Sequence, residues 1–136
     1  MDIVLVDTSV WINFFKAKET KASLFLKNNL STIIIATCPV IVQEVLQGIV
    51  SDKEFKLVNS RFEMLTRFVD NPYQLAIEAA RLYREIRKAG FTIRNPNDCL
   101  IACYAIKNNV KLLHDDKDFN HIAMNSNLAV QSHESY

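Results

Sequence analysis

The sequence contains few of the residues that mark several large protein classes. Two glycines in 136 residues leave no glycine-rich loop for a phosphate, which excludes Walker-type and dinucleotide-binding sites. With only three prolines as well, the chain is neither collagen-like nor of low complexity. No apolar run approaches the roughly 18 residues of a membrane span, and the first residues lack the basic and long apolar segments of a secretory signal. We therefore expect a cytoplasmic protein that does not enter membranes.

Cysteine is also scarce, and its spacing excludes two kinds of small cross-linked domain. Cys38 is isolated, and Cys99 and Cys103 lie four residues apart within one predicted helix. An odd number of cysteines without paired ligand spacing fits neither a disulfide framework nor a zinc finger. We expect all three to be reduced thiols in the core of a cytosolic protein.

The chain has no large overall excess of positive or negative charge. Sixteen basic and fifteen acidic residues give a net charge of +1, which provides no general field for nucleic acid and no polybasic membrane anchor. Any site for a charged ligand must therefore come from a local arrangement of side chains.

The pattern of apolar residues is typical of one α/β domain spanning residues 1–136. Continuous β-branched runs predict strands, and apolar residues at helical spacing predict the helices between them. Strands are predicted at residues 3–6, 32–36 and 110–113, with shorter ones at 68–69 and 128–130. Helices are predicted at residues 8–15, 21–29, 39–48, 53–66, 72–89, 95–109 and 119–124. This alternation without hairpin signals favours a central, mainly parallel sheet with helices on both faces, followed by a frayed tail at 131–136.

Polar residues at helix starts predict where two of these helices begin. Thr8 or Ser9 can cap the first helix. Asn95 is predicted as the N-cap of the helix at 95–109, with Pro96 to Asp98 in its first turn.

Acidic side chains follow two of the predicted strands directly. Asp7 comes after the strand at 3–6, and Asp115, Asp116 and Asp118 come after the strand at 110–113. Ligands of open α/β sheets bind beyond the carboxyl ends of the strands. If these two strands are neighbours, their carboxylates meet in one crevice.

Two further acids lie on apolar helices. Glu44 is surrounded in sequence by aliphatic residues, and burying an unpaired carboxylate there would cost several kcal/mol, so it needs a cation or a polar pocket. Asp98 lies in the first turn of an apolar helix and can point toward the same end of the sheet. Each acid also has an ordinary explanation by itself: Asp98 as a helix-start residue, Asp7 as an N-cap, Glu44 on an exposed stripe and the acids at 115–118 in a solvated turn.

Taken together, these acids predict a metal site. Four carboxylates within roughly 6 Å of one another repel by about 2–3 kcal/mol per pair at an effective dielectric constant near 20. Such a cluster requires a counter-cation. Oxygen ligands without histidine or cysteine partners favour Mg²⁺ or Mn²⁺, and these ions serve phosphodiester chemistry.

Four segments resemble, in order, the four acidic motifs of PIN-domain ribonucleases. They are VDTSVWI at residues 6–12, QEVLQG at 43–48, NDCLIA at 97–102 and LLHDDKDF at 112–119. The similarity spans nearly the whole chain and is strongest to the VapC toxins of type II toxin–antitoxin systems. It implies a three-layer α/β/α PIN-like domain, an endoribonuclease dependent on Mg²⁺ or Mn²⁺, and inhibition by a VapB-like antitoxin whose C-terminal segment wraps the toxin. It also implies a homodimer.

The resemblance assigns roles to individual residues. The catalytic acids are Asp7, Glu44, Asp98 and Asp116. Three of these acids, Asp7, Asp98 and Asp116, are expected to hold the ion, while Thr8, Ser9 and Asp118 support them. One position departs from the family pattern, because His114 stands where relatives commonly carry Thr or Ser. We interpret His114 as structural or adjacent to the substrate, and His121 and His133 as surface or packing residues.

Two further expectations concern the surfaces that bind partners. Trp11, Phe14 and Phe15 lie near the expected site and could form a hydrophobic groove for the antitoxin, although core packing explains Phe14 or Phe15 equally well. Positive charge is concentrated on and after one helix at Arg81, Arg84, Arg87, Lys88 and Arg94. We expect Arg84, Arg87 and Lys88 to meet RNA phosphates, the alternative being a solvated helix face. The competing functions are a non-catalytic PIN module that binds RNA or protein, and a PIN nuclease of RNA processing outside any toxin–antitoxin system.

Overall fold

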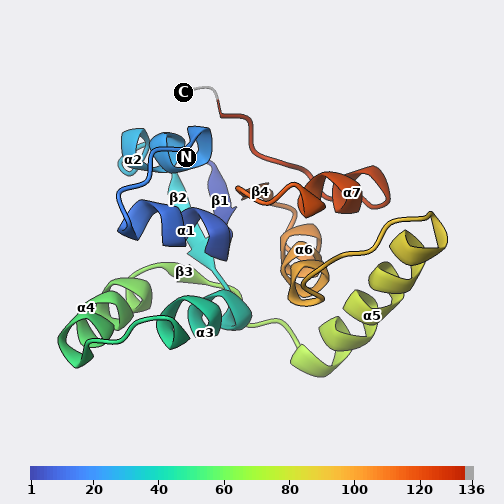
Figure 1. Cartoon of the computed structure of the whole chain (residues 1–136), viewed down its shortest axis with the longest axis horizontal. Coiled ribbons are helices and arrows are strands. Elements are labelled where there is room, and N and C mark those ends of the chain that lie inside the picture. Colours follow the sequence, from blue (N-terminus) through green and yellow to red (C-terminus); the bar gives the residue numbers. More distant parts are fainter. Residues whose placement is uncertain (134–136) are drawn as a thin grey trace.

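The chain folds around a parallel sheet. The computed structural model describes residues 1–133 and places four strands in the order β3-β2-β1-β4 (Figure 1). They are β1 (Ile3–Val6), β2 (Ile34–Thr37), β3 (Thr66–Arg67) and β4 (Lys111–Leu113). Each neighbouring pair is parallel, so the carboxyl ends of all four strands lie along one edge. The prediction of a parallel sheet is confirmed.

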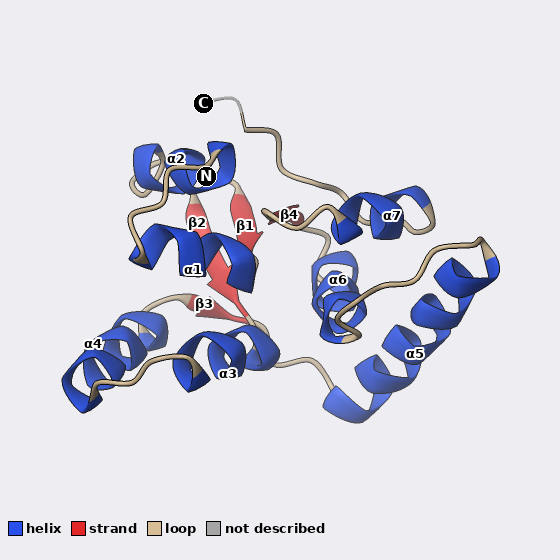
Figure 2. Cartoon of the chain, viewed as in Figure 1, coloured by secondary structure: helices blue, strands red, loops and turns tan. Residues whose placement is uncertain are grey.

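Helices surround the strands on both faces (Figure 2). They are α1 (Thr8–Phe15), α2 (Lys21–Asn28), α3 (Pro39–Gln47), α4 (Asp52–Glu63), α5 (Pro72–Lys88), α6 (Asn97–Lys107) and α7 (Asp118–Met124). Val4, Leu5 and Val6 of β1 are all fully buried. Because successive side chains of a strand point to opposite faces, both faces of β1 are covered, which gives the three-layer α/β/α architecture expected from the sequence. Within the described residues, no helix is long and apolar enough to cross a membrane.

The ladder of β1 and β4 sets the position of the first acidic residue. Leu5 pairs with Leu112, and Val6 pairs with Leu113. The backbone N–H of Asp7 continues this ladder by donating to the carbonyl of Leu113 at 2.9 Å. Asp7 is thereby fixed beside the segment that follows β4.

The helix starts differ from the predictions at α1 and α6. Asp7 itself, not Thr8 or Ser9, caps α1 by accepting a hydrogen bond from the backbone N–H of Ser9. The helix α6 begins at Asn97, one residue later than predicted, with Pro96 in place of Asn95 at the N-cap position. Asn95 instead accepts a hydrogen bond from the backbone N–H of Asn97 at 3.1 Å in the preceding turn.

Two predicted strands are also wrong in position or extent. The strand β3 lies at 66–67, not 68–69, because the chain leaves the sheet once the N–H of Phe68 has bonded to the carbonyl of Thr37. The strand predicted at 128–130 is reduced to a single bridge between Leu112 and Val130. The predicted tail begins too early, because Gln131 is 4% exposed and donates its backbone N–H to the carbonyl of Leu112. Residues 134–136 lie outside the described residues.

The three cysteines behave as predicted. Cys38, Cys99 and Cys103 are free and buried. Burial raises the pKa of the Cys38 thiol to about 12 and that of Cys103 to about 11, so these thiols are protonated at neutral pH and pack as small apolar groups.

Candidate active site

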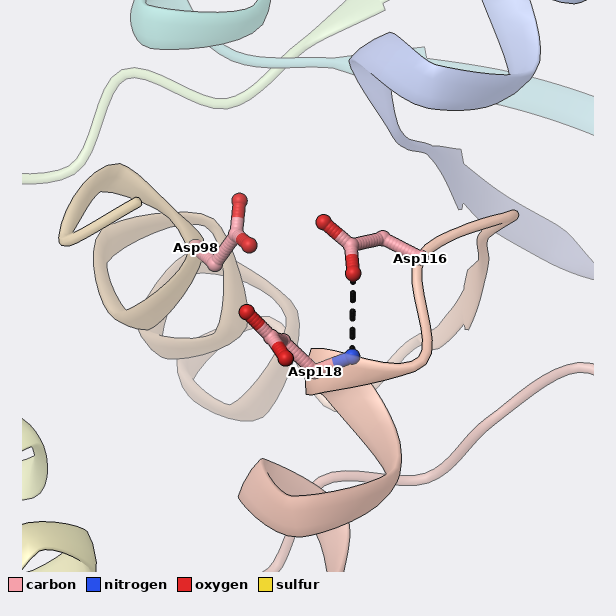
Figure 3. A group of neighbouring side chains, drawn as sticks. All are labelled: Asp98, Asp116 and Asp118. Carbon is pink, nitrogen blue, oxygen red and sulfur yellow. Dashed lines mark hydrogen bonds between the residues drawn. The ribbon is translucent and has the colours of Figure 1, made fainter. Parts of the chain in front are cut away.

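Three aspartates converge where the segment after β4 meets the start of α6. One carboxylate oxygen from each of Asp98, Asp116 and Asp118 lies within 4.8 Å of the others. Asp98 comes from the first turn of α6, Asp116 from the loop after β4 and Asp118 from the first position of α7. Figure 3 shows the three side chains pointing toward one another, and its dashed line marks the 2.9 Å bond from the backbone N–H of Asp118 to Oδ1 of Asp116.

The membership of this group differs from the expected ligand set. Asp118, expected as a supporting acid, is one of the three converging residues, whereas Asp7, expected as a ligand, is not in the group. The spacing Asp116-x-Asp118 is the sequence signal that could have predicted the part played by Asp118. Asp118 begins α7, and its backbone N–H donates to the carboxylate of Asp116. This turn brings both carboxylates to the same place.

Arg94 makes direct contact with the acidic group. Its Nε lies 3.1 Å from Oδ2 of Asp118 and its Nη2 lies 3.0 Å from Oδ1 of Asp116. Its backbone N–H also donates to Oδ2 of Asp118 at 3.1 Å. Burial alone would raise the pKa of Asp118, but these contacts with Arg94 outweigh burial and hold that pKa below its usual value. The sequence indicated only that Arg94 belongs to the positive charge on and after one helix, and gave no sign of this contact.

Asp7 is buried at the end of β1, and only one of its two carboxylate oxygens is hydrogen-bonded within the described residues. Its Oδ2 accepts hydrogen bonds from the backbone N–H of Ser9 at 3.0 Å and from Oγ of Ser9 at 2.5 Å. Its Oδ1 is buried and has no hydrogen-bond partner among residues 1–133. Burial, with a smaller contribution from the charge of Glu44, raises the pKa of Asp7 to about 6, against the lowering effect of the Ser9 bonds.

Asp98 is the acid whose ionisation is most strongly opposed. It is 4% exposed, and its Oδ2 is also buried without a hydrogen-bond partner in the described part of the chain. Burial raises its pKa to about 8, and the negative charges of Asp7 and Asp116 add to the shift. Two buried, unpartnered carboxylate oxygens beside a cluster of acids fit a site for a hard divalent cation.

Glu44 lies in the polar pocket that its sequence context required. Its Oε1 accepts a hydrogen bond from Oγ1 of Thr8 at 2.7 Å. Its Oε2 accepts from Nδ2 of Asn95 at 3.0 Å and from Nδ2 of Asn97 at 3.5 Å. Thr8 therefore orients Glu44, just as Ser9 orients Asp7. The two asparagines were missed as Glu44 partners, because their position after α5 gives no sign of a contact with α3.

Asp115 faces away from the acidic group. Its Oδ2 accepts hydrogen bonds from Nδ2 of Asn13 at 2.9 Å and from Oγ1 of Thr20 at 2.7 Å. Its backbone N–H donates to Oγ of Ser9 at 3.0 Å. Asp115 therefore ties the loop after β4 to α1 and to the N-cap of α2, and it supports Asp7 through Ser9.

The histidines pack against aromatic rings. The ring of His114 lies 5.1 Å from that of Phe119, and His121 stacks on Phe91 at 4.2 Å. Burial, together with the charge of His133, lowers the pKa of His114. Neither His114 nor His121 belongs to the group of converging acids.

A groove leads away from Glu44 between α1 and the α3–α4 segment. Phe15 lines it and is exposed, but Trp11 is a core residue that stacks beneath Phe15 at 5.7 Å, and Phe14 lines a different hollow. Of the three aromatic residues predicted to form one groove, only Phe15 therefore lines it. The lining residues are Ile12, Phe15, Lys16, Glu44, Val45, Gly48, Ile49, Val50, Ser51 and Glu54.

Comparison with known proteins shows which family the chain belongs to. Residues 4–125 match the family model described as PIN domain. The chain is 35% identical to ribonuclease VapC11 of Mycobacterium tuberculosis over 133 residues, which cover 96% of this chain and 98% of that protein. The chain belongs to the VapC ribonucleases of the PIN-domain family. A second VapC-family relative, ribonuclease VapC1 of Methanocaldococcus jannaschii, is 32% identical over 84% of this chain and 76% of that protein.

Solved structures agree on the fold of this VapC-family chain. VapBC-1 from nontypeable Haemophilus influenzae matches with a TM-score of 0.72 at 20% identity, covering 96% of this chain and 98% of that chain. VapBC2 from Rickettsia felis, bound to a DNA fragment from its promoter, matches with a TM-score of 0.71 at 19% identity, covering 95% and 97%. The family resemblance found in the four acidic motifs is thus confirmed.

Proposed function

We propose that this VapC-family protein is a metal-dependent endoribonuclease that hydrolyses RNA phosphodiester bonds, and that it is the toxin of a VapB–VapC pair. The observation that carries the proposal is the convergence of Asp98, Asp116 and Asp118 within 4.8 Å, in a chain 35% identical to a VapC ribonuclease along nearly its whole length. The membership of the family supports RNA as the substrate, and the acidic group supports the metal.

In this proposal Asp98, Asp116 and Asp118 hold Mg²⁺ or Mn²⁺. The set keeps two of the ligands expected from the sequence and replaces Asp7 with Asp118, because Asp118 belongs to the converging group and Asp7 does not. A bound divalent cation would make a water molecule more acidic and stabilise charge on the phosphate under attack.

Asp7 is proposed as the residue that orients the attacking water and accepts its proton. Its Oδ1 is free of other hydrogen bonds in the described structure, while Ser9 fixes Oδ2. A pKa of about 6 leaves Asp7 ionised at neutral pH yet basic enough to accept a proton. Glu44, held by Thr8, adds negative charge beside Asp7, and it is proposed to act as the fourth catalytic acid.

An RNA cleavage assay with and without metal tests this function. Purified protein should cleave total cellular RNA in Mg²⁺ or Mn²⁺, leaving 5′-phosphate and 3′-hydroxyl ends, and EDTA should remove the activity. RNA binding without cleavage at any concentration of either ion would instead support a non-catalytic binding module and refute the enzyme.

The proposed partner is a VapB-like antitoxin. The solved neighbours include VapBC assemblies. The groove between α1 and the α3–α4 segment offers apolar side chains, including Ile12, Phe15 and Ile49, and ends at Glu44. An apolar segment carrying a basic residue at the Glu44 end complements this surface. Homodimer formation, which the family resemblance implies, is part of the same proposal.

Arg84, Arg87 and Lys88 are proposed to bind RNA phosphates beside the acidic group. Arg84 is exposed and lines a hollow that also includes Asn97, the residue before Asp98. The Arg87 guanidinium lies 5.7 Å from the centre of the Tyr83 ring, and Lys88 pairs with Glu85 at 3.6 Å. Arg84 is therefore the residue of this set best placed to reach a substrate at the site.

Reversing charge in this set should weaken RNA binding. The double variant Arg84→Glu and Arg87→Glu should lower RNA affinity at least tenfold and reduce the slope of log affinity against log salt by about 1–2. Lys53→Glu with Lys56→Glu on α4 makes the same change of charge away from the site and serves as the control. Equal affinities and salt slopes in the two double variants would show that the α5 residues form only a solvated helix face.

A further inference from the structure

Arg94 is in contact with two of the carboxylates that the proposed function assigns to the metal. It belongs to the segment joining α5 to α6, and its guanidinium bridges Asp116 and Asp118 at 3.0 and 3.1 Å. The bridge is made of two charge-assisted hydrogen bonds from one planar group, a geometry that also suits the oxygens of a phosphate. A divalent cation and this guanidinium would have to share the same carboxylates.

The contact has the features of a reversible ion pair. The side chain of Arg94 is 67% exposed, whereas that of Asp118 is 7% exposed. Exposed ion pairs contribute little to folding stability, because water solvates the free charges well. The guanidinium nevertheless relieves the repulsion among the converging acids for as long as no other cation is bound.

The backbone of Arg94 is anchored independently of its side chain. The main-chain N–H donates to Oδ2 of Asp118 at 3.1 Å, and Ile93 immediately before it is buried. The side chain can therefore rotate away while its Cα stays beside the acidic group. Released in this way, the guanidinium would remain at the rim of the site, within its own side-chain length of Asp116 and Asp118.

We propose that Arg94 is an exchangeable cation, which pairs with Asp116 and Asp118 in the metal-free protein and moves to an RNA phosphate when a divalent ion takes the carboxylates. This inference rests on the proposed function and adds a substrate-binding residue to it. The exchange links the two ligands: the residue that opposes binding of the metal supports binding of the RNA.

The test measures Mn²⁺ affinity and RNA kinetics in the same variants. Arg94→Gln removes the competing charge, so Mn²⁺ titrated calorimetrically into the RNA-free protein should bind at least about fivefold more tightly. With saturating Mn²⁺, the same variant should raise the KM for RNA about tenfold, because one phosphate contact is lost, while kcat changes less than threefold. Arg61→Gln on α4, an exposed arginine away from the acidic group, should leave both quantities unchanged.

Arg94→Lys separates the two roles and guards against a folding defect. Lysine keeps the charge for a phosphate but presents a single ammonium in place of the fork, so this variant should recover most of the RNA KM while binding Mn²⁺ more tightly than the wild type.

Each unfavourable result has a distinct meaning. Unchanged or weaker Mn²⁺ binding in Arg94→Gln would overturn the exchange, and tighter Mn²⁺ binding with an unchanged KM would overturn the transfer to phosphate. A wild-type protein that binds Mn²⁺ but cleaves no RNA would refute the proposed nuclease while the Mn²⁺ comparison still decides whether Arg94 competes. Failure of the wild type to bind Mn²⁺ would overturn both proposals.

Discussion

Asp98→Asn should abolish RNA cleavage and, at neutral and high pH, make the metal-free protein more stable. Asparagine has nearly the same shape as aspartate but carries no charge, so a divalent ion loses a ligand from a group of three. We expect kcat/KM to fall by at least about a thousandfold, the scale of losing a group that stabilises transition-state charge. Asp7→Asn should cause a comparable loss, because a neutral amide cannot accept a proton from water.

The stability of Asp98→Asn moves in the opposite direction from its activity. Burial raises the pKa of Asp98 to about 8, so above that pH the wild type carries a buried charge among other negative charges. Below that pH the wild type also loses stability, because its unfolded carboxyl ionises while the folded one keeps its proton. Asparagine should therefore raise the melting temperature in EDTA by on the order of 5 °C or more at pH 7, and slightly more at pH 9. The increase in melting temperature that Mn²⁺ gives the wild type at neutral pH should disappear.

Thermal scans with and without Mn²⁺, together with RNA cleavage rates, check both halves of this prediction. Asp52→Asn changes an exposed acid in the first turn of α4 and is the matched control, with activity and Mn²⁺ response retained. Full activity of Asp98→Asn would show that the metal site lies elsewhere.

The sequence predicted the position of the acids well because local rules fix it. A buried strand, its carboxyl end and a helix start are each encoded within a few residues, and parallel pairing then brings the strand ends to one edge. Asp7 and Asp116 were placed at strand ends in this way, and β1 and β4 are neighbouring strands, as the prediction required. The place of Asp98 in a first helical turn was predicted correctly, even though α6 begins one residue later than predicted.

The orientation of individual side chains was beyond the sequence, because it depends on partners far along the chain. Asp115 and Asp116 are adjacent, yet Asp115 turns to Asn13 and Thr20 while Asp116 joins the acidic group. Arg94 follows the basic residues of α5 in the sequence, but its side chain bonds to Asp118, 24 positions later. Periodicity and capping rules carry no information about such contacts.

The weak edges of the sheet were the least predictable elements. The strand β3 has two residues, and the bridge at Val130 has one partner. At this length the pattern of apolar residues cannot separate a strand from extended chain. Neither element carries a residue of the acidic group, so these errors did not affect the site.

In EDTA the protein should lose stability as the pH rises through the neutral range. Unfolded aspartates have a pKa near 3.8, while the folded values are about 6 for Asp7 and about 8 for Asp98. Between these values the folded state binds more protons than the unfolded state, so the free energy of unfolding falls with increasing pH. The effect of Asp7 is complete near pH 6, and that of Asp98 continues to about pH 8.

Other groups shift in the opposite sense but titrate lower. The lowered pKa of Asp118 adds stability that is lost only as the pH falls through its folded value, below 3.8. The lowered pKa of His114 makes stability rise with pH, but only up to its unfolded value of 6.5. Of these four groups, only Asp98 still makes stability depend on pH above pH 7. The buried thiols of Cys38 and Cys103 add to its effect only toward pH 9, where cysteines of the unfolded chain ionise.

Urea unfolding in EDTA at several pH values from 7 to 8, below the range in which cysteines of the unfolded chain ionise, isolates this contribution. The free energy of unfolding of the wild type should fall by about 1 kcal/mol across this interval, since a folded pKa near 8 releases its proton there while the unfolded carboxyl has none to release. Asp98→Asn should remove the slope, and Asp7→Asn should keep it. Saturating Mg²⁺ should reverse the trend relative to EDTA, because the ion binds the ionised carboxylates and its stabilisation grows as protons leave. A wild type with a flat profile, or a slope that survives in Asp98→Asn, would mean that Asp98 is already ionised at neutral pH, and the acidic group would then need its counter-cation even before a divalent ion arrives.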